Sequence, residues 1–194
     1  VGHFAFGRLI TATPYPANGG TASGGGVFQS GDGVTLTANA KPGYAFVNWT
    51  EGGIEVSARY HGFAQTGGDL FVHVPSEKIV WTGNPLVATQ PAVPWLLAGH
   101  AGEVNTTLSQ VRASLPPDTR IIPGHDHPTD AHGMDFSINY LSNLLSEVGS
   151  AKTQGLTVEQ TVARVTLPTF QGYKIWDWVH KQVNVPSTYA ELAR

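Results

Sequence analysis

The sequence predicts an α/β protein, of the α+β type, in which an all-β N-terminal segment precedes a sheet covered by helices. Up to about residue 57, Gly-rich turns separate short stretches of alternating apolar and polar residues. Two compact apolar runs follow from about residue 69, and helical spacing of apolar residues dominates from about residue 104. The expected domains are therefore a β-rich segment over residues 1–57 and a mixed half-domain over residues 58–194.

The composition excludes several classes of protein. The chain has 194 residues, of which 13% are charged, together with 23 Gly and 13 Pro, which favours turns and short strands over long exposed helices. A formal net charge of −3 provides no basic surface, so we expect neither nucleic acid nor a membrane as a partner. No run approaches the roughly 18 apolar residues of a membrane-spanning helix. Because the chain has no Cys, a metal would need His and carboxylate ligands.

The first segment is expected to fold as short hairpins. Residues 34–39 and 54–60 alternate with a period of two, so each stretch is predicted to bury one face. Sequences that permit positive φ or preset a turn separate the strands. These turns are Asn18-Gly19-Gly20, Gly24-Gly25-Gly26, Gly31-Asp32-Gly33, Lys41-Pro42-Gly43 and Glu51-Gly52-Gly53. None has the spacing of a phosphate-binding loop, so nucleotide binding is not expected.

The rest of the chain is expected to combine strands and helices. Strands are predicted over residues 70–74, 79–81 and 120–122, and helices over residues 104–115, 134–148 and 175–183. Thr157 and Gln160 have the spacing of a capping box, which predicts the start of one more helix. Sheet faces in such an order require helical cover.

Several short motifs resemble the second half of a metallo-β-lactamase-fold hydrolase. They occur in the family's order as Thr66-Gly67-Gly68-Asp69-Leu70, Thr82-Gly83-Asn84-Pro85, Ile121-Ile122-Pro123-Gly124-His125, Asn184-Val185 and Tyr189-Ala190-Glu191-Leu192. The resemblance covers residues from about 60 to 194 and implies a truncated form of that sheet-and-helix architecture. Separately, residues from about 8 to 57 resemble the β-repeat of bacterial surface proteins related to internalin. That likeness depends on Gly33-Val34-Thr35-Leu36-Thr37-Ala38 and Pro42-Gly43-Tyr44-Ala45-Phe46-Val47-Asn48-Trp49.

The hydrolase resemblance implies a two-metal site, but the chain departs from the family's ligand pattern. The H-x-H-x-D-H loop of the family is absent. Gln65 stands where the family has the His of Ala-His-Thr, and Asn84 stands where it has the Asp of Thr-Gly-Asp. Only His125 matches. Since catalytic zinc normally needs three protein ligands and a water, the family mechanism cannot be carried over unchanged.

Residues 124–135 carry the strongest chemical signal, because they place three His and three Asp within twelve residues. We expect His125 and His127 to bind a divalent metal, zinc or calcium, with Asp130 or His132 completing the set. Such a metal would polarise a carbonyl and activate water for ester or lactone hydrolysis. Outside this segment, His61 is either a further ligand or a hinge residue. The candidate metal ligands are thus His61, His125, His127, Asp130 and His132.

The same residues allow other interpretations. A metal-free His paired with Asp126 would act as a general base, because imidazole titrates near neutral pH. Alternatively, Asp130 or Asp135 only caps a helix. Elsewhere, His73 is expected to point outward from its strand, and His100 to cap a helix or lie at a rim. The five Trp are expected mainly to bury area in the core.

Two functions follow from these patterns. The first is a hydrolase that acts on a small ester or lactone, with His125, Asp126 and His127 as catalytic residues. The second is a non-catalytic binding or surface module, in which the hydrolase half is a structural remnant and the β-repeat mediates adhesion or dimerisation. Without the family's first half, a sheet face and edge need new cover, so a homodimer is expected. The repeat and the absence of Cys favour an extracytoplasmic location, although the chain starts without the pattern of a signal peptide.

Overall fold

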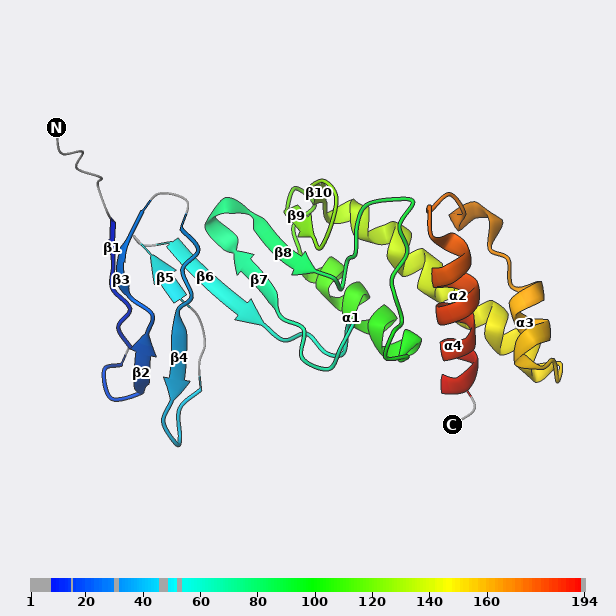
Figure 1. Ribbon diagram of the computed structural model, residues 1–194, viewed down its shortest axis with the longest axis horizontal. Coiled ribbons are helices and arrows are strands. Elements are labelled where there is room, and N and C mark those ends of the chain that lie inside the picture. Colours follow the sequence, from blue (N-terminus) through cyan, green and yellow to red (C-terminus); the bar gives the residue numbers. More distant parts are fainter. Residues whose placement is uncertain (1–7, 15, 30–31, 46–48, 52–53, 193–194) are drawn as a thin grey trace. The chain divides into compact units, whose positions relative to one another are not determined.

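A computed structural model describes residues 8–14, 16–29, 32–45, 49–51 and 54–192 (Figure 1). The chain forms two compact units, Val1–Asn48 and Trp49–Arg194, which are considered separately. Residues 46–48 of the repeat motif, Gly31 and the Gly52-Gly53 turn lie outside the described residues. The α/β fold class is confirmed, with strand-only sheets in the first unit. No described helix is long and apolar enough to cross a bilayer.

The first unit consists of two small antiparallel sheets. β1 (Arg8–Ile10) pairs with β3 (Gly26–Phe28), and β2 (Gly20–Ser23) pairs with β4 (Thr37–Ala40). Gly24 follows β2 with φ +94°, and a Cβ there would lie 2.0 Å from the carbonyl oxygen of Thr35, so only glycine allows this close approach. None of residues 9–14, 16–29 and 32–45 is fully buried. This part of the unit therefore depends on backbone pairing more than on a core.

The second unit is built around a six-stranded sheet in the order β10-β9-β8-β7-β6-β5. The strands are β5 (Trp49–Glu51), β6 (Ile54–Arg59), β7 (Phe71–Val74), β8 (Ile79–Gly83), β9 (Arg120–Pro123) and β10 (Thr129–Asp130). Only the β8–β9 pair is parallel among the described strands. The expected boundary after residue 57 falls inside β6, which pairs with both β5 and β7.

Helices complete this unit (Figure 1). They are α1 (Ala101–Ser114), α2 (Asp135–Thr153), α3 (Val158–Arg164), a π-helical segment η4 (Asp177–Asn184) and α4 (Val185–Glu191), with short 3-10 turns at Pro75–Glu77, Ala131–Met134 and Pro168–Phe170. The predicted capping box is confirmed: the Thr157 hydroxyl accepts from the backbone N–H of Gln160, whose side chain accepts from the Thr157 N–H. The helix predicted over residues 175–183 is π-helical and continues directly into α4.

The two faces of the sheet differ in burial. Ser57, His73, Val80 and Ile121 are cross-strand neighbours on one face, and all of them are buried. The adjacent row on the opposite face is Ala58, Val72, Trp81 and Ile122, of which Trp81 is 42% exposed. The prediction that His73 points outward is wrong. His73 lies two residues from Phe71, which is in the core, and residues two apart in a strand share a face.

A buried polar network ties the helices to the loop before α1. The Tyr140 hydroxyl lies 2.9 Å from His180 Nδ1, and His180 Nε2 lies 2.6 Å from the carbonyl oxygen of Val165. The Asn184 amide donates to the Tyr140 oxygen (2.9 Å) and to the carbonyl oxygen of Pro94 (2.7 Å). Each of these buried polar side chains therefore has a hydrogen-bond partner, as is normal for buried polar groups.

Candidate functional site

The predicted site follows the carboxyl end of β9, where the chain is fixed by backbone hydrogen bonds. Gly124 N donates to Leu86 O (3.0 Å), and His125 N donates to Val87 O (2.7 Å). A Cβ at Gly124 would lie 2.3 Å from Asn84 Oδ1 and 3.0 Å from the Asn84 backbone nitrogen. This contact requires glycine and places the residues after β8 and β9 together. Asn84 thus contacts Gly124, which directly precedes His125. The resemblance implies metal ligands at positions 84 and 125, and the backbone brings these two positions close together.

The three predicted catalytic residues diverge after that point. The His125 ring packs near the Trp95 ring, with centroids 5.9 Å apart. Asp126 adopts a left-handed conformation (φ +66°), and its carboxylate accepts from the Thr89 hydroxyl at 2.8 Å. His127 Nε2 lies 3.5 Å from Asp126 Oδ1, but the His127 side chain is 90% exposed. The structure thus brings Asp126 and His127 together in solvent and directs His125 toward Trp95.

Asp130, His132 and Asp135 form a second set of contacts. The Asp130 carboxylate accepts from the backbone N–H groups of His132 (2.9 Å) and Gly133 (3.2 Å), so its prediction as a helix cap is confirmed. His132 Nδ1 lies 2.9 Å from Arg112 Nη2 and 3.3 Å from Asp135 Oδ2. Arg112 Nε also donates to the Asp135 carboxylate at 2.9 Å, so Asp135 acts as an ion-pair partner of α1.

His61 pairs with His73, a partner that the sequence did not indicate. Their Nε2 atoms are 3.3 Å apart, and the His61 ring meets the Phe71 ring edge-on. Burial, followed by the nearby Arg59 cation, lowers the pKa of both imidazoles, that of His73 to about 4. Both rings are therefore neutral at neutral pH, and one donates to the other. His61 lines a hollow of about 480 Å³ with Phe63 and α1 residues.

The predicted metal ligands do not converge. Among the described residues, no group of three or more His, Asp or Glu side chains is arranged to hold a metal ion. The contacts above divide the candidates between the Asp126 pair, the Asp130–Asp135 set and the His61–His73 pair. The described residues therefore do not fit the two-metal centre that the hydrolase resemblance implies.

One family model matches the N-terminal part of the chain. Residues 10–64 match the family model of the divergent InlB B-repeat domain, which confirms the resemblance to an internalin-type repeat. The match extends beyond the first compact unit and includes β5 and β6. No curated protein matches the chain.

Solved structures are similar in fold to most of the chain. The stereoselective inverting sec-alkylsulfatase Pisa1 from Pseudomonas sp. is similar with a TM-score of 0.59 and 17% identity, over 85% of this chain and 28% of that chain. A double mutant of the same sulfatase gives a TM-score of 0.56 and 15% identity, over 80% of this chain and 27% of that chain. A metallo-beta-lactamase from Pontibacter korlensis gives 0.44 and 19% identity, over 54% of this chain and 50% of that chain.

These likenesses show the fold and no more. In fold, this chain is similar to the alkylsulfatase, and its residues 10–64 match the divergent InlB B-repeat domain. It spans about a quarter of the sulfatase and half of the lactamase.

Proposed function

We propose that this chain is a non-catalytic binding module, in which the hydrolase-fold unit is a scaffold and the InlB-type repeat contacts a partner. The observation that carries this proposal is the type of residue found at the positions where the resemblance implies metal ligands. Gln65 and Asn84 supply amides in place of an imidazole and a carboxylate, and amides are weaker ligands for zinc. His125 alone keeps the family residue, and the nearby His127 is turned into solvent.

Exposed apolar side chains on the repeat support a binding role. Leu9 and Val27 are direct cross-strand partners in the β1–β3 sheet. Their side chains are 73% and 68% exposed, although both are large and apolar. An exposed cross-strand apolar pair on a small sheet is a feature of interaction surfaces. We propose that a protein partner covers this pair, and that the repeat places the chain at a cell surface or outside the cell.

Metal analysis and thermal denaturation test the non-catalytic assignment. The protein is purified, incubated with zinc, desalted and analysed for bound metal, then melted with and without a chelator. We expect less than one metal per chain and an unchanged melting temperature, because no described ligand set would link metal binding to folding. Stoichiometric zinc, together with ester or lactone hydrolysis that the chelator abolishes, would overturn the proposal.

A metal-free hydrolase is the second candidate, favoured by one arrangement. The Thr89 hydroxyl holds Asp126, and Asp126 in turn faces His127, which is the order of an orienting group, a carboxylate and a general base. In this candidate, His127 would activate water toward a small ester or lactone. The test is hydrolysis by wild type, His125→Ala and His127→Ala, with His132→Ala as the control from the same loop. Loss of activity in His127→Ala alone supports it, and equal rates in all four proteins refute it.

The homodimer is proposed on the outer face of the sheet. The row Ala58, Val72, Trp81 and Ile122 is apolar, and its exposed member Trp81 offers apolar area that a second copy would bury. Sedimentation velocity of wild type and Trp81→Lys provides the test. We expect a dimer that the substitution dissociates, whereas a wild-type protein that stays monomeric at high concentration contradicts the proposal.

A further inference from the structure

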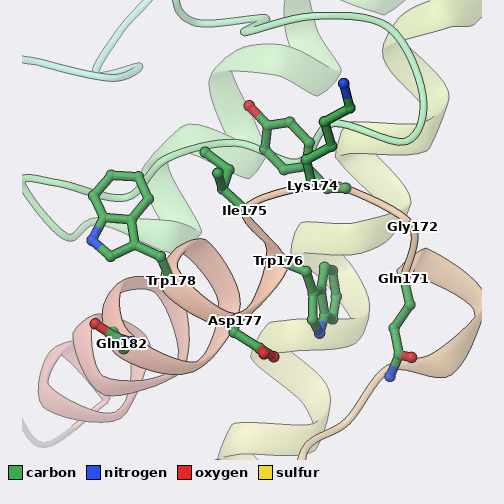
Figure 2. Close-up of a pocket in the computed structure, with 9 residues that line it drawn as sticks. Gln171, Gly172, Lys174, Ile175, Trp176, Asp177, Trp178 and Gln182 are labelled. Atoms are coloured by element: carbon green, nitrogen blue, oxygen red, sulfur yellow. The ribbon is translucent and has the colours of Figure 1, made fainter.

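A hollow among the described residues lies between the end of the Pro168–Phe170 turn and the start of η4 (Figure 2). It has a volume of about 570 Å³, which falls within the range of small-molecule sites. Its lining is Gln171, Gly172, Tyr173, Lys174, Ile175, Trp176, Asp177, Trp178 and Gln182. None of these residues belongs to the predicted hydrolytic site or to the repeat. The hollow is therefore a separate feature of the scaffold.

Aromatic rings provide its apolar surface. Trp178 is 40% exposed, and Figure 2 shows its indole extending away from Trp176. The Trp178 ring packs against Trp95 at a centroid distance of 5.9 Å and an interplanar angle of 77°, so it is held in place while much of it faces solvent. Trp176 is stacked on His180 at 4.3 Å. The lining thus offers a fixed aromatic surface, and the negative face of an indole attracts C–H groups.

Polar groups complete the lining. The Nε1–H of Trp176 is buried and has no hydrogen-bond partner among the described residues, although 92% of this residue is buried and such donors are normally paired. Figure 2 shows this nitrogen directed toward the side where the Asp177 carboxylate and the Gln171 amide lie. The Gln171 nitrogen donates to Thr166 O (3.1 Å), which leaves its oxygen as an acceptor. The Gln182 amide adds both a donor and acceptors.

Few charged side chains line the hollow. Its lining contains one cation, Lys174, and one anion, Asp177, and Asp177 is paired with Lys181 at 2.7 Å. Only two of the nine lining residues are charged, and aromatic rings and amides make up most of the rest. The lining therefore suits a ligand that carries hydroxyl groups, which both donate and accept, and that presents a flat C–H face to an indole.

We propose that this hollow binds a neutral saccharide with equatorial hydroxyl groups, such as a β-linked glucose unit. A pyranose ring of this kind has axial C–H groups on its faces and hydroxyls around its edge. Its face stacks on Trp178, and its hydroxyls pair with the amides of Gln171 and Gln182 and the Asp177 carboxylate. This proposal does not depend on the partner contact that we propose for the repeat. An experiment that refutes one of the two proposals therefore leaves the other unchanged.

Cellobiose titration, followed by the indole N–H signals in NMR, tests this site. Trp176→Phe and Trp178→Phe spectra assign the two relevant signals. We expect cellobiose to shift the signals of Trp176 and Trp178 with a Kd of about 1 mM, typical of a shallow polar site. Trp178→Ala is expected to weaken binding about three- to tenfold through loss of the stacking surface. Gln182→Ala, at an exposed position, is expected to weaken it by a similar factor.

Tyr44→Ala is the matched control, because Tyr44 is an aromatic residue that is 44% exposed and does not line the hollow. Cellobiose binding by this variant is expected to equal that of wild type. Sorbitol, which carries hydroxyls without a rigid ring face, is expected to leave all indole signals in place. The proposal is overturned if cellobiose shifts neither indole signal, if sorbitol shifts both equally, or if folded Trp178→Ala and Gln182→Ala both bind cellobiose as wild type does.

Discussion

Tyr140→Phe is expected to weaken the helical part of the second unit by removing one oxygen from a closed network. His180 Nε2 lies 2.6 Å from the carbonyl oxygen of Val165, which assigns the imidazole proton to Nε2 and leaves Nδ1 as an acceptor. The Tyr140 hydroxyl therefore donates to Nδ1 and accepts from the Asn184 amide. Phenylalanine leaves His180 Nδ1 without a partner and one of the two Asn184 amide N–H groups unpaired, while the amide still donates to the carbonyl oxygen of Pro94.

The magnitude follows from counting the unsatisfied groups. Each buried donor or acceptor left unpaired costs about 1–3 kcal/mol, so two give a loss of about 2–4 kcal/mol once partial relaxation is allowed. The ring itself stays, and with it the edge-on contacts of residue 140 with Phe170 and Trp176. No large cavity forms, so the expected loss arises from hydrogen bonding alone.

Urea denaturation followed by Trp fluorescence measures this loss. Tyr189→Phe is the matched control, because the Tyr189 hydroxyl donates one hydrogen bond to Leu156 O (2.8 Å) in a partly buried position. Its removal is expected to cost about 0.5–1.5 kcal/mol. If Tyr140→Phe costs no more than Tyr189→Phe at an unchanged denaturant slope, the inference that Tyr140 completes the pairing of His180 and Asn184 is refuted.

Three further outcomes are expected. Burial, Arg59 and His61 lower the folded-state pKa of His73 to about 4, so between pH 6.5 and 4 the unfolded chain binds a proton that the folded chain does not. The free energy of unfolding is therefore expected to fall as the pH drops from about 6.5 to about 4. Urea denaturation at a series of pH values measures this decline, and His73→Phe is expected to flatten it. Thr157→Ala removes the hydroxyl that accepts from the backbone N–H of Gln160, and it is expected to lower the free energy of unfolding by about 1 kcal/mol. Thermal denaturation measures this loss, with Thr153→Ala as the control because Thr153 lies at a helix end without capping it. Gly124→Ala forces a Cβ to within 2.3 Å of Asn84 Oδ1 and is expected to lower the melting temperature, whereas Gly68→Ala, where nothing lies within 4 Å, is not.

The elements that the sequence predicted well are those with a local physical cause. The capping box at Thr157 needs only two side chains three residues apart, and it is present as expected. The strand at β9 and the cap at Asp130 are also local. By contrast, β4 begins at Thr37, three residues after the start that the alternation of apolar and polar residues predicted. The strand begins where it can pair with β2, and this pairing is not visible in the local sequence.

The predicted active site fails to assemble for a reason that spacing alone does not reveal. Alternation would have placed His125 and His127 on one side of an extended loop. Instead, His125 is tied to Val87 by its backbone, and Asp126 takes a positive φ that turns the chain. That single left-handed residue separates the two imidazoles. The His61–His73 pair was likewise not predictable, since it depends on how the chain leaves β6 and returns in β7.

Asn84 shows how a position at which the resemblance implies a metal ligand can pack without a cation. In a two-metal site, the ligand carboxylates and imidazoles would be costly to bury without the cations that balance them. An amide at Asn84 carries no charge, so it can pack against Gly124 with no counter-ion. The Tyr140 network and the apolar core then stabilise the unit from the helical side. Under the proposed function this unit needs no metal for its stability, so we expect both melting that a chelator leaves unchanged and the absence of turnover.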